Sequence, residues 1–154
     1  GSSKRLYSDA ERERRDSTKW TLVQGILAPV QFIVFLISLA LVVRYLLTGV
    51  GYDVATLSII VKTAFLFAIM VTGAIWEKVV FGQYLFAPAF FWEDVFSFGV
   101  IALHSLYVYA LFTNALTANG LMLLALAAYA AYVINAGQFL WKLRMARLDA
   151  EGRK

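Results

Sequence analysis

The chain has 154 residues, of which 61% are hydrophobic and 16% are charged, and its formal net charge is +4. About a quarter of the residues of an ordinary soluble domain are charged, so this composition argues against a soluble protein. Cysteine is absent, which excludes disulfides, thiolate metal sites and cysteine-ligated iron–sulfur clusters. His104 is the only histidine, so one chain cannot hold a haem between two histidines.

Charge gathers at the two ends of the chain. Ten charged residues lie in residues 1–19 and seven follow Trp141, whereas only seven lie between Trp20 and Trp141. We therefore expect a polar tail over residues 1–19, in which Gly1–Ser3 are typical of a cloning remnant. The tail has no apolar core of the kind that a cleavable signal peptide needs. The positive charge of the tails indicates contact with anionic lipid and not with nucleic acid.

Four segments have the length and composition of membrane-spanning helices, which need about 20 predominantly apolar residues. They cover residues 20–47, 54–81, 89–112 and 121–143. Together they form one domain over residues 20–143, followed by a second polar tail over residues 144–154. Short connections favour antiparallel neighbours, so the sequence predicts an all-α integral membrane protein with a four-helix bundle. Lysine and arginine gather in both tails, so we expect both termini in the cytoplasm.

Four of the seven central charges form two adjacent pairs, Glu77-Lys78 and Glu93-Asp94, around one short connection. Charge is costly inside a membrane, so these residues are functional candidates. Acids near a helix start also complement the helix dipole, which is the structural alternative for Glu93 and Asp94. Their apolar neighbours favour a neutral carboxyl, and two acids held in different states could provide one proton donor and one base.

Two lysines of the second predicted helix have a structural explanation. Lys78 lies at the helix end and can extend its amine to the headgroups, while the stem stays in the apolar region. Lys62 lies deeper and nearer the opposite surface, and we expect it to snorkel in the same way. Lys78 remains a candidate for substrate contact because it neighbours the acids.

Polar residues share a face on two of the predicted helices. Glu93 and His104 are eleven residues apart, which is about 16 Å along a helix, so they can contact opposite ends of one large ligand but not each other. His104 has two interpretations: a hydrogen bond to a neighbouring polar side chain, or a role as axial metal ligand or proton donor. Gln31 belongs to a stripe with a seven-residue repeat, and it and Asn135 are candidates for hydrogen bonds between helices or for ligand contact.

The connection over residues 81–92 is too apolar for a solvated loop. Tyrosine and tryptophan are favoured at the membrane interface, so we expect this segment to lie there. Tyr84 and Trp92 would form part of an aromatic platform beside the acids, suited to a flat, hydrophobic substrate. The structural alternative is an interfacial belt with no ligand.

One long motif resembles a known family. The stretch GAIWEKVVFGQYLFAPAFFWED, residues 73–94, is similar to the 3-vinyl bacteriochlorophyllide hydratase family of bacteriochlorophyll biosynthesis, and the likeness extends through TLVQGILAPVQF and NAGQFLWKLR over nearly the whole chain. The resemblance implies that water adds across the C3 vinyl group of a chlorophyllide-type tetrapyrrole and gives a 1-hydroxyethyl group. It implies no cofactor, because the magnesium belongs to the substrate.

The resemblance also implies a place in the cell. It favours the bacterial inner membrane, either the cytoplasmic membrane or the intracytoplasmic photosynthetic membrane. Partners would be the tetrapyrrole and the lipid bilayer, together with a second copy of the chain or other enzymes of pigment biosynthesis. A pocket between subunits or open to lipid would suit so wide a substrate.

Residue roles follow from the chemistry of alkene hydration, because the resemblance transfers no catalytic residues. Protonation of the terminal vinyl carbon leaves a cation conjugated with the macrocycle, so the protein must supply an acid, a base or positioned water, and nearby negative charge. Glu93 or Asp94 is the candidate proton donor, and the other acid, or Glu77, would orient water.

Substrate contacts are expected on both sides of these acids. His104 is the candidate for axial contact with the substrate's magnesium, directly or through water. Lys78, Lys142 and Arg144 are candidates for pairing with the substrate's propionate. Two other functions share these features: a non-catalytic pigment-binding or assembly subunit, and a proton-coupled transporter. Transport needs ionisable groups near the bilayer midplane, and the acids lie toward one surface instead.

Overall fold

The computed structural model of the chain describes residues 6–151, so Gly1–Ser3 lie outside the described residues. Its elements are α1 (Asp9–Ser17), α2 (Lys19–Thr48), α3 (Tyr52–Phe81), the short 3₁₀ helix η2 (Pro88–Phe90), α4 (Phe91–Thr113) and α5 (Ala118–Glu151). The described chain is thus all-helical, and four of its helical segments are long and apolar enough to cross a membrane. This confirms the predicted fold class at the level of four apolar spans.

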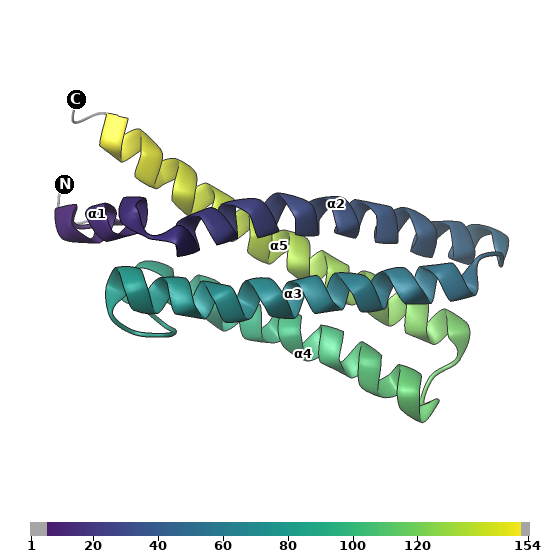
Figure 1. Ribbon diagram of the computed structural model, residues 1–154. Coiled ribbons are helices and arrows are strands. Elements are labelled where there is room, and N and C mark those ends of the chain that lie inside the picture. Colours follow the sequence, from purple (N-terminus) through teal and green to yellow (C-terminus); the bar gives the residue numbers. More distant parts are fainter. Residues whose placement is uncertain (1–5, 152–154) are drawn as a thin grey trace.

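The four long helices pack mainly as two pairs. α2 lies along α3 and α4 lies along α5, whereas contacts between the two pairs are fewer. Figure 1 shows α1 and the end of α5 at the same end of the molecule as the connection between α3 and α4. That end also holds the acidic residues singled out by the sequence.

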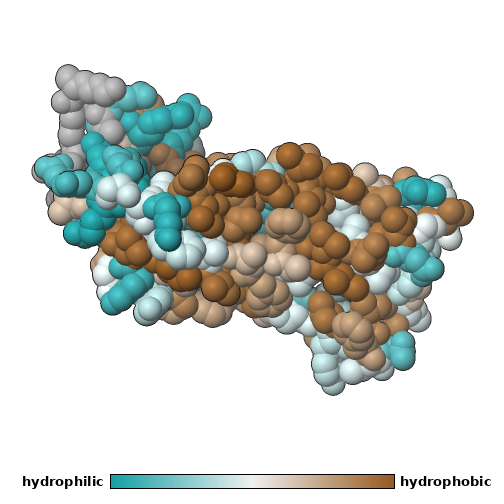
Figure 2. All heavy atoms as spheres, in the orientation of Figure 1, coloured by the Kyte–Doolittle hydropathy of each residue, from teal (hydrophilic) through white to brown (hydrophobic). Residues whose placement is uncertain are grey.

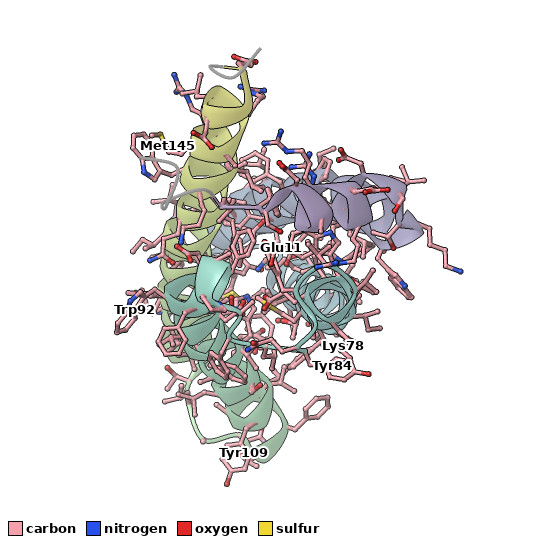
Figure 3. The ribbon with its side chains drawn as sticks, turned by 90° about the vertical axis from the view of Figure 1, so that its left-hand side faces the viewer. Glu11, Lys78, Tyr84, Trp92, Tyr109 and Met145 are labelled. Carbon is pink, nitrogen blue, oxygen red and sulfur yellow. The ribbon has the colours of Figure 1, made fainter. Side chains whose placement is uncertain are left out.

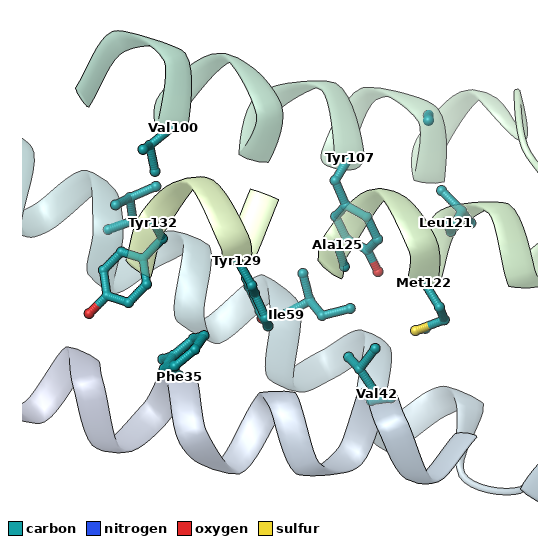
Figure 4. Packing of buried hydrophobic residues seen from close by; sticks show 13 residues of the cluster. Phe35, Val42, Ile59, Val100, Tyr107, Leu121, Met122, Ala125, Tyr129 and Tyr132 are labelled. Atoms are coloured by element: carbon teal, nitrogen blue, oxygen red, sulfur yellow. The ribbon is translucent and has the colours of Figure 1, made fainter. Parts of the chain in front are cut away.

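The interior between the pairs is lined by large apolar and aromatic side chains (Figure 4). Phe35 lies with its ring centroid 5.3 Å from that of Tyr129 and 5.1 Å from that of Tyr132, so rings of α2 and α5 meet in the core. Such packing supplies dispersion contacts that substitute for the hydrophobic effect, which is weak between helices inside lipid.

The outer face of the long helices is hydrophobic. Figure 2 shows a broad apolar surface along α2 and α3, with hydrophilic residues gathered around α1 and at the far end. Leu47 and Phe112, for example, are largely exposed. A water-soluble monomer rarely exposes a contiguous apolar surface of this extent, so the surface is the expected lipid contact of a membrane protein.

The N-terminal helix α1 lies within the predicted polar tail and was not predicted. Ser8 and Glu11 form a reciprocal capping box: the Ser8 hydroxyl accepts from the Glu11 N–H, and the Glu11 carboxylate accepts from the Ser8 N–H. Arg14 donates from Nε and Nη2 to the carbonyl of Val80 at 3.0 and 2.8 Å. The Tyr7 ring stacks on Phe81. These contacts fasten α1 to the end of α3 that bears Glu77.

Candidate active site

Three acids lie buried at one end of the bundle. Glu77 of α3 is 4% exposed, and Glu93 and Asp94 in the first turn of α4 are 7% and 5% exposed. Acids that merely complement a helix dipole would remain in contact with solvent or headgroups. Their burial requires that each carboxyl find hydrogen-bond donors or a proton inside the protein.

Glu77 and Asp94 form a carboxyl pair. The two carboxyls face each other across the interface of α3 and α4, close enough for a hydrogen bond between them. Two ionised carboxylates contain no donor, so such a hydrogen bond forms only when the pair carries a proton. The backbone N–H of Phe86 donates to Asp94 Oδ2 at 3.0 Å, and the N–H of Ala87 donates to Glu77 Oε2 at 3.4 Å. The connecting segment therefore caps the pair, and the two adjacent carboxyls are suited to share a proton.

The segment over the pair has an uncommon backbone conformation. Phe86 has φ of 61°, in the left-handed region that a bulky residue rarely occupies. Its N–H is held by Asp94, and its ring stacks on Phe98 with a centroid separation of 5.5 Å and lies 5.6 Å from the ring of Phe91. The surrounding contacts thus fix a strained residue directly beside the carboxyl pair, and such strain often accompanies functional sites.

Glu93 has a different partner. Its Oε1 lies 3.0 Å from Nζ of Lys142 on α5, and the same amine donates to the carbonyl of Ala89 at 2.7 Å. The amine and the carboxylate form an ion pair. The three acids therefore divide into two carboxyls that face each other and a third that faces a lysine. Lys142, a candidate for the substrate's propionate, is engaged by Glu93 in this arrangement.

Asn135 and Gln31 are both buried, but their environments differ. Asn135 Nδ2 donates to the carbonyl of Glu93 at 3.0 Å, and its Oδ1 lies 3.0 Å from Ser97 Oγ. Asn135 thus makes the hydrogen bonds between helices that its structural interpretation predicts. Gln31 is 3% exposed, and its Oε1 has no hydrogen-bond partner among the described residues. A buried amide oxygen without a donor is free to accept a hydrogen bond from a ligand.

Gln24 and Ser38 lie seven residues before and after Gln31 in the same stripe of α2, and both follow the structural interpretation. Gln24 Nε2 donates to the hydroxyl of Thr72 on α3. Ser38 Oγ is 2.8 Å from Ser58 Oγ and 2.6 Å from the hydroxyl of Tyr129. The stripe therefore faces the neighbouring helices, and Gln31 differs from these members in having an unsatisfied oxygen.

Lys62 does not snorkel, so that prediction is wrong. Its side chain is 0% exposed and faces the bundle interior, where Nζ lies 3.0 Å from His104 Nε2 and 3.6 Å from the centroid of the Tyr132 ring. Lys62 occupies the same helical face as the buried residues Ile59 and Leu66, so its stem points inward and away from the lipid. The histidine acceptor and the aromatic face provide polar contacts that the lipid surface lacks.

His104 is hydrogen-bonded at both ring nitrogens. Nδ1 lies 2.8 Å from the carbonyl of Val100. Because a carbonyl only accepts, Nδ1 carries a proton, and in the neutral ring Nε2 accepts from Lys62. His104 is thus hydrogen-bonded to a neighbouring polar side chain, as its structural interpretation predicted. A contact between Nε2 and magnesium requires Lys62 to release this nitrogen.

The connection over residues 81–92 does not form the single aromatic platform that the sequence predicted. Tyr84 and Trp92 are 59% and 66% exposed, and Figure 3 shows them on different sides of this end of the bundle. Lys78 lies on the Tyr84 side and donates from Nζ to the carbonyl of Gly82 at 3.1 Å. Phe90 is buried instead. The surface therefore presents two separate aromatic contacts in place of one platform.

A shallow apolar groove lies on the outer face of α4 and α5. Its floor is open at Gly99, where an added Cβ would meet no neighbour. The lining residues are Val95, Phe96, Gly99, Val100, Leu103, Ala131 and Ile134. This lining contains no charged side chain, and it begins at the residue that follows Asp94 in the sequence.

Comparison with known proteins gives a consistent result. The sequence model of the 2-vinyl bacteriochlorophyllide hydratase family matches residues 7–145. The chain is 72% identical over 149 residues to a 2-vinyl bacteriochlorophyllide hydratase of Cereibacter sphaeroides, covering 96% of this chain and 92% of the relative. It is 71% identical over 149 residues to the protein of the same name from Rhodobacter capsulatus, covering 97% of this chain and 86% of the relative. No solved structure was found to match the chain.

Proposed function

Because the chain belongs to the 2-vinyl bacteriochlorophyllide hydratase family, we propose that it adds water across a vinyl group of a bacteriochlorophyllide with a proton held by Glu77 and Asp94. It is thus a hydro-lyase of bacteriochlorophyll biosynthesis. The observation that supports this mechanism best is the close approach of the two buried carboxyls, because two like charges side by side in an apolar region favour a shared proton.

The reaction needs no redox step. The π electrons of the vinyl group form a new C–H bond with the proton of the carboxyl pair, and the remaining cation is conjugated with the macrocycle. The oxygen of a water molecule then bonds to the vinyl carbon that carries the positive charge, and the proton that the water loses returns to the carboxylate. The site recovers its proton, and the product is the substrate plus one water. General acid–base help of this kind typically contributes about 10²–10⁴-fold.

Glu93 has the role of a fixed negative charge in this proposal. It is adjacent in sequence to Asp94 and forms an ion pair with Lys142 at 3.0 Å. Adjacent helical residues diverge by about 100°, so Glu93 and Asp94 face different partners. A carboxylate near the forming cation stabilises it, because charge interactions are stronger where water is excluded.

The remaining candidates would contact the substrate at its periphery. Lys78, Tyr84 and Trp92 are exposed near the acids and would meet the pigment as it arrives at the membrane surface. Gln31 has a free buried oxygen, and Asn135 holds the first turn of α4 in place. His104 would contact the magnesium of the substrate once its Nε2 is released. These assignments rest on the geometry of the side chains and on the chemistry of the pigment.

The proposed membrane arrangement follows from the chain itself. The four spans would be antiparallel neighbours with both termini in the cytoplasm of a bacterial inner membrane, because the basic residues gather in the two tails. The carboxyl pair then lies toward the cytoplasmic surface. The apolar groove beside Asp94 allows a lipid-soluble pigment to approach from the bilayer, alone or with a second copy of the chain completing the site.

The decisive experiment uses the purified protein in lipid nanodiscs. Incubation with a vinyl bacteriochlorophyllide should yield a product heavier by one water, detected by mass spectrometry and by the absorption shift that accompanies loss of the conjugated vinyl group. Unchanged pigment that nevertheless binds would contradict the proposal and favour a pigment-binding or assembly subunit instead. Asp94→Asn provides the matched inactive control.

A further inference from the structure

Lys62 is a buried lysine whose amine has no carboxylate partner in the part of the chain that the structure describes. Among the described residues, its polar contacts are His104 Nε2 at 3.0 Å and the faces of Tyr132 and Tyr129 at 3.6 and 5.3 Å. The ion pairs between described residues are Arg15–Asp16 and Glu93–Lys142, and neither includes Lys62. The amine can donate three hydrogen bonds, whereas His104 accepts one.

Such an arrangement is unfavourable for a protein with no ligand. Removing an ammonium from water costs several kcal/mol, and neutral partners recover only part of that cost. Ionisable residues inside membrane spans accordingly tend to line sites for charged ligands or to pair with one another. The other two lysines of the candidate site differ in this respect. Lys142 is matched by Glu93, and Lys78 is exposed at the surface and bonded to a carbonyl.

The position of Lys62 relative to the acids fits a macrocycle. Its partner His104 lies ten residues after Asp94 in α4, which corresponds to about 15 Å along the helix, and both residues are buried. Lys62 also lies between the two helix pairs, which contact each other less than the helices within each pair do. A flat ligand that enters between the pairs by moving them apart would meet both the carboxyl pair and Lys62.

We propose that Lys62 binds the propionate carboxylate of the tetrapyrrole and thereby fixes which edge of the macrocycle faces Glu77 and Asp94. This inference rests on the proposed function and extends it to substrate selectivity. The free acid of a bacteriochlorophyllide supplies the negative charge that the site lacks, and an esterified pigment does not. When the amine turns toward the carboxylate, it releases His104 Nε2, which can then meet the magnesium.

The test compares a free-acid vinyl bacteriochlorophyllide with its methyl ester. Affinity is measured by quenching of intrinsic tryptophan fluorescence in nanodiscs, so no turnover is required. Wild-type protein should bind the free acid at least about 30-fold more tightly than the ester, the effect expected for a buried charged hydrogen bond. Lys62→Met should remove this preference without weakening the binding of the ester, whereas Lys62→Arg should retain most of the preference.

Three results would overturn the assignment. They are the absence of a preference in the wild-type protein, equal weakening of both pigments by Lys62→Met, and loss of the preference in Lys78→Met in place of Lys62→Met. The wild-type comparison decides the matter even if a variant does not fold, and circular dichroism reports folding. Failure of the proposed hydration would be seen separately, as wild-type protein that binds the free acid selectively without producing a pigment heavier by one water.

Discussion

The acid cluster and the Lys62–His104 pair are both buried ionisable sites. Only the acids find hydrogen-bond donors or an opposite charge within the protein. Glu77 and Asp94 face each other and accept backbone N–H groups, and Glu93 faces Lys142. Lys62 faces an imidazole and two aromatic rings. We therefore expect the acid cluster to be ready for proton transfer without a ligand, and Lys62 to gain its anionic partner from one.

The largest expected effect is at the carboxyl pair. Glu77→Gln and Asp94→Asn should each lower the hydration rate by about 10²–10⁴-fold, because the amide can neither deliver the shared proton nor take it back. Both amides fit the same volume and still meet the neighbouring carboxyl. Single-turnover absorption measurements with saturating pigment report the rate, and tryptophan quenching should show that binding persists.

Near-normal hydration in both variants would remove the acid role from the pair. Ser97→Ala is a suitable control, because it removes a buried hydroxyl from the same face of α4 without touching a carboxyl. It should change the rate by less than the two carboxyl variants. A rate as low as theirs would indicate that packing around α4, and not the proton, limits the reaction.

A smaller effect is expected at the Lys62–His104 pair. His104→Ala should weaken binding of the magnesium pigment about tenfold, or about 1.4 kcal/mol, by removing an axial contact. The same variant should bind the magnesium-free pigment as the wild-type protein does. An equal loss with both pigments would show that His104 acts only by positioning Lys62, which is its partner at 3.0 Å.

Glu93→Gln should reduce the hydration rate by about tenfold or less. Its carboxylate is already matched by Lys142, and this partner reduces the field that reaches the forming cation. The rate in nanodiscs, compared with that of Asp94→Asn, ranks the two adjacent acids. A greater loss at Glu93 than at Asp94 would reverse the assignment and make Glu93 the proton donor.

Sequence reasoning located the spans and the acids because both follow from local composition. Long apolar segments define helices in lipid, and acids inside them are conspicuous. It could not sort the three acids, because the sorting depends on which residue of another helix lies opposite: Lys142 faces Glu93, and Asp94 faces Glu77. Each partner is distant in sequence.

Two other features were missed for different reasons. The helix α1 had a local signal, the capping box of Ser8 and Glu11, which its polar composition obscured. Lys62 had none, because a lysine that snorkels and a lysine that faces a buried histidine have the same apolar neighbours in the sequence. Only the orientation of α3 relative to α4 distinguishes them, and that orientation results from packing between helices.

The smallest expected effect concerns how α1 is fastened beside the acids. Arg14→Ala removes two hydrogen bonds to the carbonyl of Val80 and should cost about 1–2 kcal/mol of local stability, because a guanidinium contributes strong hydrogen bonds that are partly exposed here. Limited proteolysis within α1 should accelerate about fivefold to thirtyfold. Arg12→Ala is the matched control on the same helix and should not change the cleavage rate. If both variants are cleaved alike, the faster cleavage results from the loss of a positive charge and not from the loss of the contact with Val80. The end of α3 that bears Glu77 is then stabilised without α1.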